Sequence, residues 1–317
     1  MSIMPANAPS AKPVPAPRPS ASLVVVNARN EILLVQRNPQ ARSFGGMTVF
    51  PGGNFDEGED DSLAITAIRE TFEESGLLLA RPKASNSRMP SDAILDEARH
   101  AIHSRQTTFR DFLDTHGLEA DTHKLLPFTQ WITPIGPPRR FRTQFYVTFL
   151  RDVSASGFSA GDKQERIPKP DGGLEVISAR FMPPSAALDE CRSGNIAFMP
   201  PQFYIIQTLN SILVSSQSSP DERQRVAQLA RGTFGSMIIN PRGLPAKDAK
   251  GRSVLTYEGD ESRGGKPGRR HRVMVKMDSK TGGLTKDIEL ERNFDIFTEI
   301  DWTSKDQVSL DDLRPKL

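Results

Sequence analysis

The sequence predicts a domain of mixed α and β structure, and three observations lead to that prediction. Two short runs of apolar and β-branched residues, at 22–26 and 31–36, flank a polar segment and predict two strands joined by a turn. Residues 62–75 instead repeat apolar side chains at helical spacing. Strand-like and helix-like segments then follow one another as far as residue 214. A chain of 317 residues with 37% hydrophobic residues can bury a core, so these elements are expected to pack together.

The later elements follow from the same two periodicities. Further strands are expected at 47–50, 77–79, 128–133, 142–150 and 175–182, and helices within 91–116 and at 184–192 and 200–213. After a Ser-rich stretch, a helix at 222–231 and short strands at 237–240, 254–257 and 273–277 are expected. Glycines and charges predict that residues 259–272 form a mobile surface hairpin.

Composition divides the chain into three parts. Residues 1–20 are rich in Pro, Ala and Ser and are expected to be disordered, because they contain too little apolar surface to offset the entropy of ordering. Residues 21–214 are expected to form the main domain, with a helical insertion at about 91–116. Residues 221–317 are expected to form a C-terminal extension that is partly flexible.

The helix expected at 62–75 has both of its ends marked in the sequence. Ser62 can accept a hydrogen bond from a free amide of the first turn, and Gly76 can adopt the left-handed conformation of a C-terminal cap. The apolar residues of its buried side are Leu63, Ala64, Ala67, Ile68 and Phe72.

Glu70, Glu73 and Glu74 lie on one face of this helix, about a turn apart. Like charges at this spacing repel, and a hard divalent cation bound through oxygen would remove the repulsion. The pattern therefore indicates a site for Mg²⁺ or Mn²⁺. The alternative from these residues alone is a solvated acidic helix face.

The surrounding residues resemble a known motif. Arg69, Glu70, Glu73, Glu74, Gly76 and Leu77 match the end of the Nudix box, G-x5-E-x7-R-E-U-x-E-E-x-G-U with U apolar, of pyrophosphate-cleaving hydrolases. Two residues more than the box allows lie between Gly53 and Arg69, so its early acidic position falls on Glu59 or on Asp61. Thr71 stands where the box usually has an apolar residue.

This resemblance implies roles for the charged residues. Glu73 and Glu74 would bind the metal, and Glu70 would complete that site or orient the attacking water. Arg69 would hold a carboxylate of the box in place. Glu59 is the early acidic candidate counted from the glycine, and Glu175, on a later expected strand, is a candidate general base.

The segment just upstream carries a second pattern. Residues 33–53 resemble a signature found before the box in Nudix enzymes that hydrolyse coenzyme A, with Arg37, Arg42, Gly52 and Gly53 in register. A guanidinium offers a planar pair of donors to a phosphate, so both arginines are candidates for substrate binding. The alternative is that they only solvate a strand end and a loop.

Two later segments narrow the resemblance to the peroxisomal acyl-coenzyme A diphosphatase branch. They are WITPIGPPRRFRTQFYVTFL, with Arg139 and Arg140 at a Pro-rich turn, and MPPQFYIIQTL. The branch implies an α/β/α sandwich on a mixed sheet, and cleavage of coenzyme A or acyl-coenzyme A to 3′,5′-ADP and an (acyl-)phosphopantetheine. It also implies that Arg139 and Arg140 could contact substrate.

Two other functions remain open from the sequence. One is a Nudix hydrolase for a different nucleoside diphosphate derivative, such as ADP-ribose, NADH or a capped nucleotide, since the box reports only the bond that is cleaved. The other is a catalytically silent Nudix domain used for binding. The presence of all four charged residues of the box argues against the silent domain.

Charge and targeting signals limit the partners. With 41 basic and 39 acidic side chains the net charge is +2, which gives no case for a general nucleic-acid binder. No apolar run has the length of a membrane span, and the single cysteine suits a reducing compartment. The last residues, Pro315-Lys316-Leu317, are similar to a peroxisomal address, so a peroxisomal import receptor is an expected partner. The cytoplasm is the alternative location.

Overall fold

The computed structural model describes residues 15–41, 45–84, 88–137, 139–150, 176–278 and 284–300. Within these residues, eight strands form one mixed sheet: β1 (Arg18–Val26), β2 (Ile32–Arg37), β3 (Thr48–Val49), β4 (Gly52–Asn54), β7 (Leu126–Ile132), β8 (Phe141–Phe149), β9 (Val176–Met182) and β10 (Ile238–Ile239). The order is β10-β7-β8-β1-β2-β3, with β4 paired to β1 and β9 paired to β2. The β1–β8 and β10–β7 pairs are parallel and the others antiparallel.

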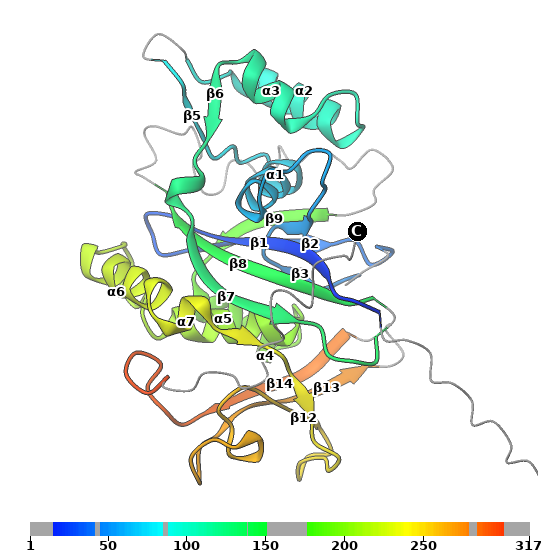
Figure 1. The fold of residues 1–317 in the computed structure, drawn as a ribbon, viewed down its shortest axis with the longest axis vertical. Helices are drawn as coiled ribbons and strands as arrows, with labels where there is room; N and C mark the ends of the chain where they lie inside the picture. Colours follow the sequence, from blue (N-terminus) through cyan, green and yellow to red (C-terminus); the bar gives the residue numbers. More distant parts are fainter. Residues whose placement is uncertain are drawn as a thin grey trace, which may run out of the picture.

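Helices cover both faces of this sheet (Figure 1). They are α1 (Leu63–Ser75), α2 (Asp92–His103), α3 (Phe109–Thr115), α4 (Pro184–Arg192), α5 (Pro200–Asn210), α6 (Pro220–Arg231) and α7 (Thr233–Ser236). In Figure 1, α1 lies above the sheet with α2 and α3 beyond it, and α5, α6 and α7 lie below. None of the helices in the described ranges is long and apolar enough to cross a membrane.

Strand β1 shows why the sheet must be covered on both sides. Leu23 and Val25 belong to the core cluster that contains α1, whereas Val24 and Val26 belong to the cluster that contains α5. Successive side chains of a strand point to opposite faces, so a continuous apolar run needs a partner on each face. The mixed α and β class predicted from the sequence is confirmed, with a helical layer on each side of the sheet.

The ordered structure begins earlier than the sequence indicated. β1 starts at Arg18, inside the segment expected to be disordered, because its backbone pairs on both sides. Arg18 aligns with Phe141 of β8, and Ser20 aligns with Asn54 of β4. The Ser20 and Thr143 hydroxyls also hydrogen-bond at 2.7 Å. Backbone pairing of this kind leaves no signal in composition.

The insertion consists of two helices that pack on α1. α2 and α3 occupy the range in which helices were expected, and the Phe112 ring of α3 stacks on Phe72 of α1 at 5.6 Å between centroids. The prediction that residues 77–79 return to the main sheet is wrong. The chain instead forms β5 (Ala80–Pro82), which pairs with β6 (Leu118–Ala120) in a small separate sheet at the base of the insertion.

The part of the chain after residue 214 is built into the core. α6 and α7 pack beside β7, and β10 adds a strand to the main sheet, so the main domain extends past residue 214. A second sheet then follows, made of β11 (Arg242–Gly243), β12 (Ser253–Thr256), β13 (His271–Asp278) and β14 (Leu284–Arg292). β11 and β14 were not expected from the sequence.

The segment 259–272, expected as a mobile surface hairpin, is only partly at the surface: residues 262, 264 and 266–268 are exposed, but Asp260, Arg269 and His271 are buried. Asp260 is 0% exposed and accepts hydrogen bonds from the Arg272 guanidinium at 2.6 and 2.8 Å. Burial alone would raise the pKa of Asp260, but hydrogen bonds from Arg272, Ser262 and the His271 amide lower it to about 2. Asp260 and Arg272, two of the charges that suggested exposure, are therefore paired with each other inside the protein.

His271 links the second sheet to α5. It is 0% exposed; its Nδ1 lies 2.6 Å from the Glu258 carbonyl oxygen and its Nε2 lies 2.9 Å from the Tyr204 hydroxyl. A carbonyl can only accept, so Nδ1 carries the proton and Nε2 accepts from Tyr204. Burial lowers the pKa of His271 to about 3. The imidazole is therefore neutral in the folded protein.

We expect this histidine to make the protein sensitive to acid. The folded-state pKa lies below the ordinary value of 6.5, so the stabilisation is complete above that value and is lost as the pH falls toward about 3. Between about pH 7 and about pH 5 the loss should be about 2 kcal/mol. Urea unfolding of wild type and His271→Gln at both pH values measures it, with the exposed His123→Gln as control. An equal pH dependence of stability in wild type and His271→Gln would contradict the assignment.

Candidate active site on the acidic face of helix α1

Arg69 is the centre of the charged cluster on α1. The residue is 6% exposed, and its Nε and Nη2 atoms donate to the two oxygens of Asp60, each at 2.9 Å. Its Nη1 donates to Glu70 at 3.0 Å and to Glu73 at 2.8 Å. Burial alone would lower the pKa of Arg69, but the hydrogen bond to Asp60 and the neighbouring glutamate charges raise it above its ordinary value. Arg69 is thus a permanent cation that fixes several carboxylates.

Helix α1 presents this cluster because its ends are where the sequence predicts them. The Ser62 hydroxyl accepts from the Ile65 amide, and Gly76 is left-handed with φ 75°, its amide donating to the Phe72 carbonyl. Thr71, the unusual polar residue of the box, is 0% exposed and its hydroxyl donates to the Ala67 carbonyl at 2.7 Å. Its polar group is therefore satisfied within the helix.

Asp60 is the residue that sequence reasoning missed. The structure turns Asp61 outward, where its carboxylate is 74% exposed and pairs with Arg110 at 2.5 Å. Glu59 faces inward, 19% exposed, with its Oε2 atom 3.9 Å from Arg69 Nε. Asp60, between them, is fully buried and makes the two direct hydrogen bonds to Arg69. The sequence shows three consecutive acidic residues ahead of the helix, but it does not show which of them is buried.

Of the two candidates for the early acidic position, only Glu59 lies near the cluster. Burial raises the pKa of Glu59, the charge of Arg69 opposes that rise, and the charge of Glu73 adds to it. The Glu59 carboxylate is therefore electrostatically coupled to that of Glu73. Two carboxylates that bind the same metal ion would have to be close in this way.

Glu74 lies on the other side of the face and has different partners. Its carboxylate is 5% exposed; it accepts from the Gly52 amide at 3.0 Å and from Arg37 Nη1 at 3.2 Å. Arg37, expected to bind a phosphate, is thus brought to the acidic face and pairs there with Glu74. The upstream signature and the box form one site in space.

Gly52 and Gly53 are both confined by close neighbours, in different ways. A Cβ atom on Gly53 would lie 2.3 Å from Glu70 Oε1, so the absence of a side chain lets Glu70 lie against the backbone of β4. A Cβ atom on Gly52 would instead lie 2.4 Å from the Ala21 carbonyl oxygen, in the backbone of β1. The first clash is with the movable end of a side chain and the second with a fixed strand.

Alanine substitutions should separate these two constraints. Gly53→Ala is expected to displace Glu70 and reduce kcat by about 10-fold or more while leaving Tm nearly unchanged. Gly52→Ala is expected to lower Tm, because β1 must move to accommodate it. Thermal unfolding and steady-state kinetics of both variants check this, and a Gly53→Ala protein with wild-type kcat would contradict the proposed position of Glu70.

Other predicted residues are not brought to the acidic face. Arg140 donates to the Thr133 and Pro15 carbonyls at 3.0 Å each, which fixes the β7–β8 turn, and Arg139 lies exposed beside it. Arg42 and Glu175 lie outside the described residues, as does the C-terminal tripeptide.

The cluster fits a divalent cation by donor type. Glu70 and Glu73 each place an oxygen on the same nitrogen of Arg69, so their carboxylates converge. Carboxylate oxygens are what Mg²⁺ and Mn²⁺ prefer. In this structure the oxygens of Glu70 and Glu73 point to Arg69. Within the described ranges, no three Asp, Glu, His or Cys side chains surround a common centre.

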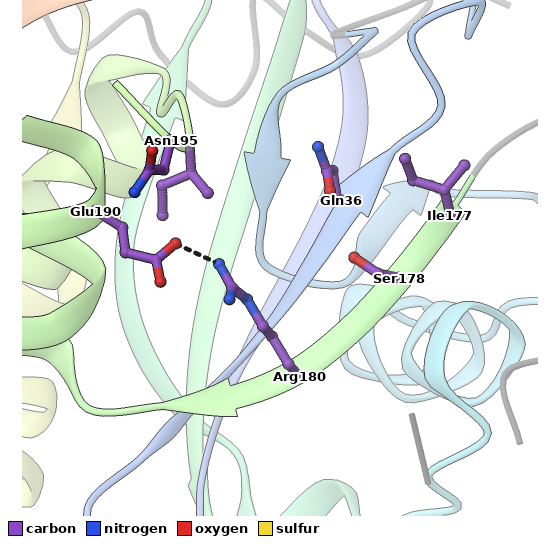
Figure 2. Close-up of a pocket in the computed structure, with 7 residues that line it drawn as sticks. Gln36, Ile177, Ser178, Arg180, Glu190 and Asn195 are labelled. Carbon is purple, nitrogen blue, oxygen red and sulfur yellow. Dashed lines mark hydrogen bonds and ion pairs between the residues drawn. The ribbon is translucent and has the colours of Figure 1, made fainter. Parts of the chain in front are cut away.

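A separate cavity of about 410 Å³ lies between β2, β9 and the end of α4 (Figure 2). Figure 2 shows Gln36, Ser178 and Asn195 around an ion pair between Arg180 and Glu190, which measures 2.7 Å. Gln36 and Arg37 are neighbours on β2 and point to opposite faces of the sheet. The cavity is therefore on the other side of β2 from the pair between Arg37 and Glu74.

Comparison with known proteins finds a family model that spans the cluster on α1. The NUDT19 Nudix domain family model matches residues 58–209. Residues 58–209 therefore resemble the Nudix hydrolases, a family that generally uses divalent metal ions. Within the family they resemble the NUDT19 branch.

Individual relatives are distant and longer than the matched region. A Caenorhabditis elegans protein assigned to the nudix hydrolases (nudix hydrolase 7) is 27% identical over 199 residues, which cover 62% of this chain and 61% of that protein. The human acyl-coenzyme A diphosphatase NUDT19 is 30% identical over 162 residues, 48% of this chain and 40% of its own. A solved NUDIX hydrolase from Alicyclobacillus acidocaldarius is 25% identical, with a TM-score of 0.48, over 64% of this chain and 94% of its own.

Proposed function

We propose that the chain is a metal-dependent diphosphatase that hydrolyses the pyrophosphate bond of coenzyme A or acyl-coenzyme A. The products would be 3′,5′-ADP and phosphopantetheine or its acyl ester. The observation that carries the proposal is the convergence of Glu70 and Glu73 on Arg69, with Glu74 and Arg37 beside them. The names of the vertebrate relatives support the choice of substrate.

Each residue of the cluster has a proposed task. Glu73 and Glu74 would hold Mg²⁺ or Mn²⁺, with Glu59 near enough to assist, and Glu70 would complete the site or orient the attacking water. When bound, the cation would offset the pyrophosphate charge and acidify a water. Arg69 keeps Glu70 and Glu73 in fixed orientations.

The substrate contacts rest on the upstream signature. Arg37 would bind phosphate beside Glu74, and Gly52 and Gly53 of β4, next to the same carboxylates, remain proposed substrate contacts. Arg42 remains a proposed phosphate ligand, and Glu175 a proposed general base. Arg139 and Arg140 remain proposed substrate contacts away from the acidic face, and Arg140 also donates to the Thr133 and Pro15 carbonyls.

Product analysis tests the proposal directly. The purified chain would be incubated with coenzyme A, an acyl-coenzyme A, ADP-ribose and NADH, each with Mg²⁺ and with excess chelator. Release of 3′,5′-ADP that requires the metal supports the proposal. Faster cleavage of ADP-ribose or NADH would assign a different Nudix specificity, and no cleavage of any substrate would indicate a binding module.

We also propose a peroxisomal location, which rests on the last three residues and on the branch that the sequence resembles. An N-terminal fluorescent tag leaves Leu317 free, and a second version lacks residues 315–317. Punctate signal that becomes diffuse on truncation supports import. Diffuse signal in both, with a working Ser-Lys-Leu control, would place the protein in the cytoplasm.

A further inference from the structure

The insertion helix α2 places a buried cation against the end of α1. Arg99 is 7% exposed, and its Nε donates to the Glu73 carbonyl oxygen at 2.5 Å. Its Nη1 lies 3.6 Å from the position that a Cβ on Gly76 would occupy. Helix α1 has no basic residue of its own in its last turn. The positive charge at this helix end therefore comes from another element.

A positive charge at the C-terminal end of α1 is favourable for two reasons. The last carbonyls of a helix lack partners within it, and its C-terminal end carries a partial negative charge. Glu70, Glu73 and Glu74 add their carboxylates close to that same end. Burial lowers the pKa of Arg99 to about 10, which still leaves the guanidinium charged at neutral pH. Arg99 thus satisfies a free carbonyl and offsets the repulsion between the carboxylates.

Glu73 is the residue on which these contacts meet. Its Oε1 accepts from Arg69 at 2.8 Å, and its Oε2 lies 3.9 Å from Nδ1 of His103, one turn after Arg99 on α2. Its backbone carbonyl is held by Arg99. The main chain and the side chain of Glu73 are therefore fixed from two different elements.

We infer that Arg99 is a positioning residue for the proposed active site. The insertion that carries Arg99 is then required for the function of that site. Arg99 holds the last turn of α1 and with it the direction of the Glu73 carboxylate. The inference rests on the proposed metal-dependent function and adds to it a residue outside the Nudix box. It predicts that the site loses metal affinity when α2 no longer holds the Glu73 carbonyl, because the Glu73 carboxylate then loses its fixed direction.

The experiment compares Arg99→Met, Arg99→Lys and a matched control, Lys83→Met, which breaks an exposed ion pair with Asp114 in the same insertion. Mn²⁺ affinity is measured by electron paramagnetic resonance, Tm by thermal unfolding, and kcat and KM with coenzyme A. We expect Arg99→Met to bind Mn²⁺ about 10-fold or more weakly. Arg99→Lys should recover most of that loss even where its Tm stays low, and Lys83→Met should bind as wild type.

The other outcomes are also decisive. Mn²⁺ affinity in Arg99→Met within about twofold of wild type, whatever happens to Tm, would mean that Arg99 only packs the insertion and would overturn the inference. If Arg99→Met does not fold, Arg99→Leu takes its place, since it also removes the donor to the Glu73 carbonyl. Arg99→Gln keeps that donor and should bind Mn²⁺ as wild type does, and a loss of about 10-fold in this variant would overturn the inference. A wild-type protein that binds no Mn²⁺ would instead refute the metal-dependent function itself.

Discussion

Replacing Glu73 by glutamine is expected to lower kcat by about 100-fold or more at saturating Mg²⁺. Glutamine keeps the shape of the side chain and removes the charge, so the fold should persist. The substitution weakens the pair with Arg69 at 2.8 Å and also relieves the repulsion from Glu70, and because these effects oppose each other, Tm should change little. Kinetics across a range of Mg²⁺ concentrations, together with Tm, measure both effects, and Glu74→Gln should behave in the same way.

The control for this substitution is Glu119→Gln, which removes an equal charge from an exposed pair with Arg81 on β5. It should leave kcat unchanged. Wild-type rates in both Glu73→Gln and Glu74→Gln would show that the acidic face is not the metal site. A loss of rate in Glu119→Gln as large as in Glu73→Gln would show that the effect is one of overall charge.

Removing Asp60 should have the largest effect on stability. Asp60→Ala leaves the buried Arg69 without the partner that binds two of its nitrogens, and breaking a buried ion pair costs about 3–5 kcal/mol. We expect the low end of that range, because Glu70 and Glu73 remain on Arg69. Urea unfolding followed by circular dichroism measures the change.

The neighbouring Asp61→Ala is the matched control, since the Asp61 carboxylate is exposed and pairs only at the surface. It should change the free energy of unfolding little. Equal destabilisation by the two substitutions would contradict the assignment of Asp60 as the buried partner of Arg69. A larger effect of Asp61→Ala would mean that Asp61, and not Asp60, is the buried partner of Arg69.

What the sequence could predict is what depends on near neighbours. The start and end of α1 follow from Ser62 and Gly76, and the acidic face follows from helical spacing, so both are found in the structure. The burial order of Glu59, Asp60 and Asp61 depends on how the loop folds back over Arg69. This arrangement brings together residues on either side of a turn, and the periodicity of neighbouring residues does not predict it.

Pairings between distant residues account for the other differences. The sequence predicts that Asp260 and Arg272 are solvated. In the structure they form an ion pair where the second sheet packs against α5. The sequence could not predict the role of Arg99, because its partner is the Glu73 carbonyl and every residue has a backbone carbonyl. Only the packing of α2 on α1 distinguishes it from a surface arginine.

The second sheet also determines how the protein can be divided. Trp131 and Tyr204 lie under Tyr257, with ring centroids 5.2 and 5.8 Å away, and the cluster continues to Ile296. The region that matches the family model begins at residue 58, after β1 to β4, and ends at residue 209, before Tyr257. A fragment limited to it would lack the middle of the sheet and would expose these rings to water, where they would promote self-association. The region that matches the family model is therefore not expected to fold by itself, and recombinant fragments for crystallisation should extend from before Arg18 to beyond Ile296.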